Sequence, residues 1–192
     1  MKKLALTAVS LLSAALLPLA ARADGLLGST VDVLYHYNDP SGPLVIETLD
    51  HVLVTAGTEL SCPGSAQLCG ALSAPSQTVD IGDSSIRYDY VGQNGNTGGF
   101  FNVAVNTFAF ESLFNSSTAL TGVQITTNIA GLNASRLSFS AHSLQLDMRG
   151  LNVDAVAFFQ LDLQTAPVPE PATAALLLGG LALVAAARRR VR

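Results

Sequence analysis

The fold of this chain is decided by residues 156–164, which read VAFFQLDLQ. Apolar side chains occupy every second position from 157 to 163, and from 160 onward they alternate with the polar residues Gln160, Asp162 and Gln164. The apolar set is Ala157, Phe159, Leu161 and Leu163. Successive side chains of a strand point to opposite faces, so this alternation predicts a strand with one buried face. The same pattern recurs over residues 31–37, 86–90 and 123–129.

Strands of this kind fill the central part of the chain. About eight or nine short strands can be counted, with glycine- and asparagine-rich turns between them and no long amphipathic helix. This pattern predicts an all-β fold, a single antiparallel β-sandwich of jelly-roll-like type, over residues 24–165. Asn94-Gly95 is a hairpin-turn signal, and it predicts that strands at 86–91 and 100–105 pair with each other.

The N-terminus has the features of a secretory signal peptide over residues 1–23. Lys2 and Lys3 form a positively charged start, and an apolar run follows over 4–19. Ala21 and Ala23 supply the small-x-small pattern that signal peptidase recognises. We therefore expect signal peptidase to cut between Ala23 and Asp24, and we leave the peptide out of the fold prediction.

The C-terminus carries a second apolar stretch. Residues 172–187 contain no charge, and at about 1.5 Å per residue a helix there spans roughly 24 Å, close to the ~30 Å hydrocarbon core of a bilayer. A basic tail over 188–192 follows at once. Its arginines are Arg188, Arg189, Arg190 and Arg192. Because arginines beside a membrane helix stay in the cytoplasm, we expect a transmembrane helix in the inner membrane. Residues 24–165, called the body below, would then lie outside the cytoplasm.

A short rigid strip precedes this apolar stretch. Pro169 and Pro171 hold the backbone extended around Glu170, which suits recognition by a processing enzyme. Together with the apolar span and the basic tail, these residues resemble the PEP-CTERM sorting domain of exported proteins of Gram-negative bacteria. The resemblance covers residues 166–192. It implies processing by an exosortase, release to the cell surface or extracellular matrix, and a host that makes exopolysaccharide or biofilm. The alternative fate is an uncleaved single-span membrane anchor.

The charge of the body excludes one class of partner. Between the two terminal segments only Arg87, Arg136 and Arg149 are basic, against thirteen acidic residues, so the net charge there is −10. Nucleic-acid binding needs basic side chains for the phosphates, so we expect no nucleic-acid partner.

The two cysteines, Cys62 and Cys69, lie close together in the sequence. In an exported domain such a pair predicts a disulfide that pins a surface loop. No second cysteine pair or neighbouring histidine completes a zinc site.

The body offers little chemistry. Its sequence contains no recognisable motif for a catalytic nucleophile, a phosphate-binding loop or a dinucleotide-binding site. We expect no enzyme activity, no cofactor and no metal. The arrangement nearest to a Ca²⁺ site is Asp80, Asp83 and Asp89 around a glycine turn, although the EF-hand order is absent.

The function predicted from sequence is a structural or adhesive role at the cell surface, linked to exopolysaccharide or biofilm. A calcium-dependent or carbohydrate-binding matrix module is the alternative, and an extracellular hydrolase is a third. The chain has no tryptophan for stacking sugars. Four tyrosines could stack sugars instead, but their alternation along strands favours a place in the core. They are Tyr35, Tyr37, Tyr88 and Tyr90.

Overall fold

The computed structural model describes residues 24–72, 76–92, 97–168 and 179. The predicted signal peptide lies outside these residues. So do the Pro-Glu-Pro strip, the arginine tail and, apart from Gly179, the predicted transmembrane helix. In the described part of the chain, no helix has both the length and the apolar character needed to cross a membrane.

One five-stranded antiparallel sheet has the strand order β2-β1-β7-β10-β9. Its strands are β1 (Thr30–Asn38), β2 (Val45–Leu53), β7 (Val105–Glu111), β9 (Leu137–Phe139) and β10 (Leu144–Asp147). Pairing along β1 is continuous on both sides, with Tyr35 opposite Thr48 of β2 and opposite Phe108 of β7.

A second five-stranded antiparallel sheet has the order β3-β4-β5-β12-β8. Its strands are β3 (Leu60–Cys62), β4 (Ser76–Ile81), β5 (Ser85–Val91), β8 (Thr118–Thr127) and β12 (Val156–Pro167). A small additional sheet joins β6 (Gly98–Gly99) to β11 (Asn152–Val153). The prediction of an all-β, antiparallel fold is confirmed.

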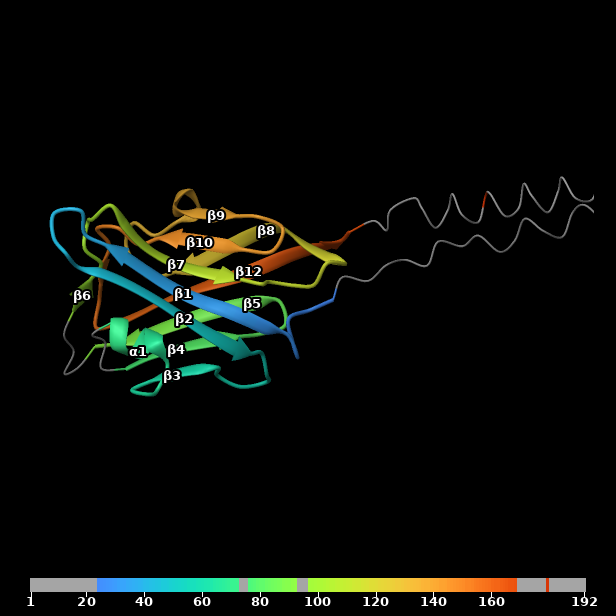
Figure 1. The fold of residues 1–192 in the computed structure, drawn as a ribbon, viewed down its shortest axis with the longest axis horizontal. Coiled ribbons are helices and arrows are strands. Elements are labelled where there is room, and N and C mark those ends of the chain that lie inside the picture. Colours follow the sequence, from blue (N-terminus) through green and yellow to red (C-terminus); the bar gives the residue numbers. More distant parts are fainter. Residues whose placement is uncertain (1–23, 73–75, 93–96, 169–178, 180–192) are drawn as a thin grey trace, which may run out of the picture.

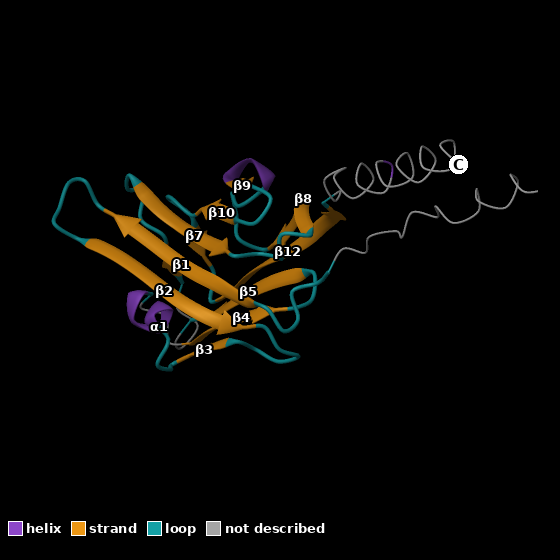
Figure 2. Cartoon of the chain, turned by 45° about the vertical axis from the view of Figure 1, so that its right-hand side comes forward, coloured by secondary structure: helices purple, strands orange, loops and turns teal. Residues whose placement is uncertain are grey.

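Within the described part of residues 24–168, helical structure is limited to two short segments at the periphery (Figure 2). They are α1 (Gln67–Ala71) and the 3₁₀ helix η2 (Ala134–Arg136). The Asp50 carboxylate on β2 accepts hydrogen bonds from the backbone N–H groups of Gln67 and Leu68 at 2.8 and 2.9 Å, which satisfies two N–H groups at the start of α1. The predicted disulfide between Cys62 and Cys69 is present and ties α1 to β3.

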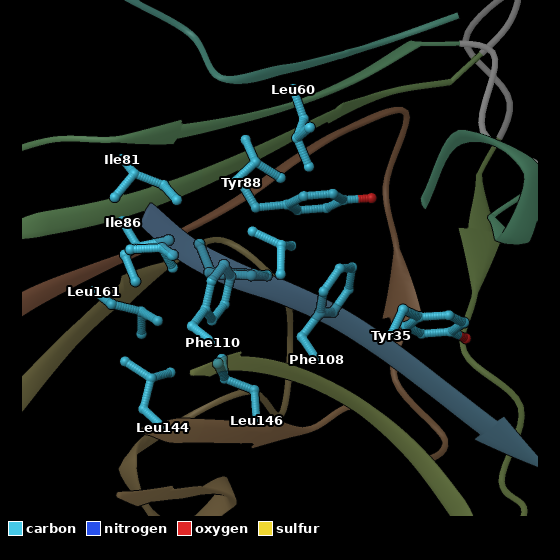
Figure 3. Packing of buried hydrophobic residues seen from close by; sticks show 14 of the residues in the cluster. Tyr35, Leu60, Ile81, Ile86, Tyr88, Phe108, Phe110, Leu144, Leu146 and Leu161 are labelled. Carbon is cyan, nitrogen blue, oxygen red and sulfur yellow. The ribbon is translucent and has the colours of Figure 1, made fainter. Parts of the chain in front are cut away.

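The two five-stranded sheets share one hydrophobic core. The Phe108 side chain from β7 is fully buried and contacts rings of both sheets. Its ring centroid lies 5.2 Å from that of Tyr35 in its own sheet, 5.1 Å from Tyr88 and 5.8 Å from Phe159 in the other. Figure 3 shows Phe108 and Phe110 pointing from β7 toward the facing residues. Offset and tilted aromatic pairs of this kind stabilise beyond their buried area.

The stretch from 156 onward forms β12, and its predicted alternation holds. Ala157, Phe159, Leu161 and Leu163 are buried, whereas the residues between them are half-buried. β12 lies between β5 and β8, so this strand is inside its sheet and not at an edge. A β-bulge shifts its register with β8 between Gln164 and Thr165.

The hairpin predicted from Asn94-Gly95 is wrong in its pairing. β5 pairs with β4 and β12, while residues 100–104 form no strand and β7 belongs to the other sheet. Along the chain, β5 of the second five-stranded sheet is followed by β6 of the small sheet and then by β7 of the first. The narrower jelly-roll-like form stays a prediction.

Candidate functional site

Strand β12 gives the β-rich body two distinct ends. Its first residue, Val156, is opposite Val91 of β5, and its last, Pro167, is opposite Thr118 of β8. Twelve residues at about 3.3 Å each place these ends roughly 36 Å apart. In Figure 1, α1 and β6 lie on the side of the molecule opposite to the end of β12.

The end reached by Pro167, here called the sorting end, holds both boundaries of the body. The backbone N–H of Asp24 donates to Thr118 Oγ1 at 2.8 Å, and the Asp24 carboxylate accepts from Asn115 Nδ2 at 2.9 Å. The N–H of Val168 donates to the carbonyl oxygen of Ser117 at 2.8 Å. The loop 115–118 therefore holds the residue after the predicted signal-peptidase cut and the residue before the Pro-Glu-Pro strip.

The opposite end contains a cavity of about 380 Å³ between the two sheets. We call it the tyrosine pocket. All four tyrosines of the chain line it, together with two phenylalanines that follow β6. These six residues are Tyr35, Tyr37, Tyr88, Tyr90, Phe100 and Phe101. The tyrosines come from the second halves of β1 and β5, which face each other across the core.

Two of the tyrosine hydroxyls are already satisfied by buried amides. Tyr35 Oη donates to Asn106 Oδ1 at 2.9 Å, and Tyr88 Oη donates to Gln77 Oε1 at 3.0 Å. Burial, with the neighbouring Tyr37, raises the pKa of Tyr35 to about 12. Burial also raises the pKa of Tyr88 well above its ordinary value. Both hydroxyls therefore stay protonated at any physiological pH.

The other two tyrosines present their hydroxyls differently. Among the described residues, the hydroxyl groups of Tyr37 and Tyr90 have no hydrogen-bond partner. No fully buried side-chain oxygen there lacks a partner. These two hydroxyls are therefore open, meaning that they are accessible from the pocket that both side chains line. Gly98 makes room for Tyr90: a Cβ at that position would lie 3.1 Å from Tyr90 Oη and 3.2 Å from Val153 Cγ2. The glycine lets the β6 backbone pack closely against the ring.

The three aspartates considered for calcium lie beside other groups of the protein. Asp89 binds Arg87 through both carboxylate oxygens at 2.7 Å. Asp80, on β4, is opposite Arg87, on β5. Asp83 accepts a hydrogen bond from the N–H of Leu27 at 3.2 Å. Nowhere in residues 24–72, 76–92 and 97–168 do three or more His, Cys, Asp or Glu side chains cluster as metal ligands would.

A serine, an aspartate and a histidine meet at the surface, which the sequence did not indicate. The Asp32 carboxylate accepts from Ser112 Oγ at 2.8 Å and lies 2.5 Å from His51 Nδ1. Partial burial raises the pKa of Asp32, but the hydrogen bonds from Ser112 and His51 outweigh it and lower the pKa overall. Both partners contact the aspartate, whereas activating a serine requires a base bonded to the serine itself.

The sequence placed the tyrosines in strands but did not reveal the pocket. Tyr35, Tyr37 and Tyr88 are buried as expected of core residues, yet no side chain of the described residues fills the space beside them. Their alternation in two separate strands was the only available signal. This alternation did not predict how the two sheets are aligned. It also did not predict the position of Phe101, which is 71% exposed at the pocket rim.

Comparison with known proteins places the C-terminal segment in a family. The family described as the PEP-CTERM protein-sorting motif matches residues 167–191, the segment that begins at the last residue of β12. No curated protein and no solved structure matches the chain significantly. The matched segment contains Pro169, Glu170 and Pro171, and it supports an exported protein that an exosortase processes. The chain therefore carries a PEP-CTERM protein-sorting motif at its C-terminal end.

Proposed function

We propose that this protein is a surface or matrix component that an exosortase releases from its membrane anchor, and that its β-rich body has a structural or adhesive role linked to exopolysaccharide or biofilm. The observation that carries the proposal is the sorting motif at residues 167–191. Released by the exosortase, the body would join the matrix outside the cell.

The position of the motif relative to the fold supports this fate. Only Val168 separates Pro167, the last residue of β12, from Pro169. The N–H of Val168 is held by Ser117, so the fold stays ordered up to the start of the cleavage substrate. A processing enzyme would therefore receive Pro-Glu-Pro at a fixed distance from a rigid body.

The chemistry of the body favours a role without catalysis. In the described residues, Ser112 and His51 bind Asp32 from two sides and do not bind each other. Each of the three arginines of the body binds an aspartate: Arg87 binds Asp89, and the other two bind Asp147. Among the described residues, no lysine and no arginine without an acidic partner is left to bind an anionic substrate.

The test is the mass and terminal sequence of the protein recovered from its own host. We expect a chain that starts at Asp24 and ends near Pro169–Pro171. We expect Glu170→Gln to accumulate in the membrane fraction with Arg192 still present. Glu47→Gln, an exposed acid on β2, is the matched control and should be processed normally.

A wild-type chain that keeps Arg192 and fractionates with membranes would refute processing and leave a single-span anchor. The matrix role needs its own test. Deleting the gene should reduce biofilm mass, and the wild-type chain should restore it while the Glu170→Gln chain should not. Unchanged biofilm in the deletion strain would contradict the matrix role even if processing is normal.

A calcium-dependent matrix-binding module is the second candidate, and the charge of the body favours it. At a net charge of −10, with its arginines paired to aspartates, the body would repel acidic polymers unless divalent cations bridge the two. Retention on host exopolysaccharide should then increase when Ca²⁺ is added and fall with a chelator. Equal retention in both conditions would remove this candidate.

A further inference from the structure

We propose that the tyrosine pocket is a binding site for a neutral small molecule with a flat apolar ring that carries a hydroxyl group. This inference does not depend on processing at the C-terminus. It is carried by the size of the cavity, by its aromatic walls and by the two open hydroxyl groups that line it.

The cavity has the dimensions of a ligand site. Its volume of about 380 Å³ falls within the range of about 300–1,000 Å³ that is usual for small-molecule pockets. Six aromatic rings line it. Two of them, Tyr35 and Tyr88, pack against the Phe108 ring of the core at 5.2 and 5.1 Å between centroids, which fixes their position. Aromatic walls favour a bound ring in an offset or edge-on arrangement.

The lining also defines the charge of the ligand. Of the residues that the structure describes, no aspartate, glutamate, lysine, arginine or histidine lines the cavity. The inner tyrosines cannot supply a negative charge, because burial raises the pKa of Tyr35 to about 12 and that of Tyr88 further. A charged ligand would lose its hydration without gaining a partner, so a neutral one is favoured.

The hydrogen-bonding capacity of the pocket is small and well placed. The hydroxyls of Tyr35 and Tyr88 are used within the protein, bonded to Asn106 and Gln77. The hydroxyls of Tyr37 and Tyr90 form no bond within the described residues, and both side chains line the cavity. Two open hydroxyls match a ligand with one or two polar groups.

The same count argues against a sugar. A pyranose carries several hydroxyls, and each one left buried without a partner is costly. Among the described residues, the lining offers no asparagine, glutamine, aspartate or glutamate side chain to receive them.

The location makes the site accessible to a ligand from outside the cell. The pocket lies roughly 36 Å along β12 from the sorting end, so anchoring at that end leaves it free. Leu44 and Phe101, both on its lining, are 52% and 71% exposed, which gives the mouth an apolar rim.

The test uses calorimetric titration of the exported protein, purified from its host, with 1-naphthol as the probe. Naphthalene-2-sulfonate provides a charged control of the same ring size, and glucose provides the sugar control. We expect 1-naphthol to bind with a stoichiometry of one, and we expect no heat from either control. Failure of 1-naphthol to bind, or binding of glucose in its place, would overturn the inference.

Two matched variants locate the binding. Leu44→Glu puts a charge on the pocket rim, and we expect it to weaken 1-naphthol binding about tenfold or more. Leu53→Glu changes an equally exposed leucine at the other end of β2, away from the pocket, and should bind like wild type. Equal affinity of the two variants would place the probe elsewhere and refute the site.

Tyr37→Phe keeps the ring and removes only one open hydroxyl, so it guards against a folding defect in the charged variant. We expect it to bind 1-naphthol roughly two- to tenfold more weakly, as the loss of one hydrogen bond predicts. The same change should leave the affinity for naphthalene, which has no hydroxyl, unaltered. An identical loss for both probes would contradict the proposed hydrogen bond.

Discussion

The buried hydrogen bond between Tyr88 and Gln77 gives the sharpest test of the structure. Both side chains are 1% exposed, and Tyr88 Oη donates to Gln77 Oε1 at 3.0 Å. The Gln77 Nε2 group lies 3.5 Å from the carbonyl oxygens of Leu68 and Leu72 and so connects β4 to the end of α1. Removing either side chain leaves the polar group of the other buried without its hydrogen-bond partner.

We expect Tyr88→Phe to lower the free energy of unfolding by about 2 kcal/mol, because it leaves the Gln77 oxygen buried and unpaired. Gln77→Leu should cost a similar amount, since it leaves the Tyr88 hydroxyl unpaired in turn. The double variant removes both polar groups together and should cost only about 1 kcal/mol. The sum of the two single-variant costs should therefore exceed the cost of the double variant by about 3 kcal/mol.

The assay is urea unfolding of the mature protein with its disulfide intact, followed by far-ultraviolet circular dichroism. This signal follows the loss of the β-sheet backbone. Tyr90→Phe is the matched control: its hydroxyl has no partner among the described residues, so its free energy of unfolding should stay within about 0.5 kcal/mol of wild type. Additive costs in the double variant would refute the reasoning, because they would mean that the two groups do not depend on each other.

Three further changes test other parts of the fold. Replacing both Cys62 and Cys69 with serine should lower the free energy of unfolding by about 2.5 kcal/mol, and adding reductant should lower the melting temperature of wild type but not of this variant. Phe108→Ala should cost about 3–5 kcal/mol and Phe108→Leu much less, as urea unfolding would show, because the ring fills the centre of the core. Hydrogen bonds from Arg149 lower the pKa of Asp147 from 3.8 to about 2. The resulting stabilisation is complete above the unfolded-state pKa and is lost as the pH falls from about 4 toward 2, so Asp147→Asn should flatten the pH dependence of unfolding in that range. An equal pH dependence in both proteins would contradict this ion pair.

The sequence was sufficient for the features that depend on neighbouring residues. Alternation over 156–164 predicted the strand β12, and the short spacing of the two cysteines predicted their disulfide. The sorting motif could also be recognised from the chain alone, because it is a short contiguous signal of proline, charge and hydrophobic length.

The same local signals failed where the partner of a strand had to be chosen. Asn94-Gly95 predicted pairing between neighbours in the sequence, but β5 pairs with β12, whose residues follow more than sixty positions later. A turn residue favours a local conformation, whereas strand pairing is settled by which apolar faces can be buried together.

The sequence by itself determined the strand pattern, the disulfide and the sorting segment, because each is encoded within a few consecutive residues. Only the tertiary structure brought Asp24 and Val168 to the same loop and the four tyrosines to one cavity. These groups come from strands far apart in the chain. Their meeting depends on the register of two sheets around a common core, which no local pattern specifies.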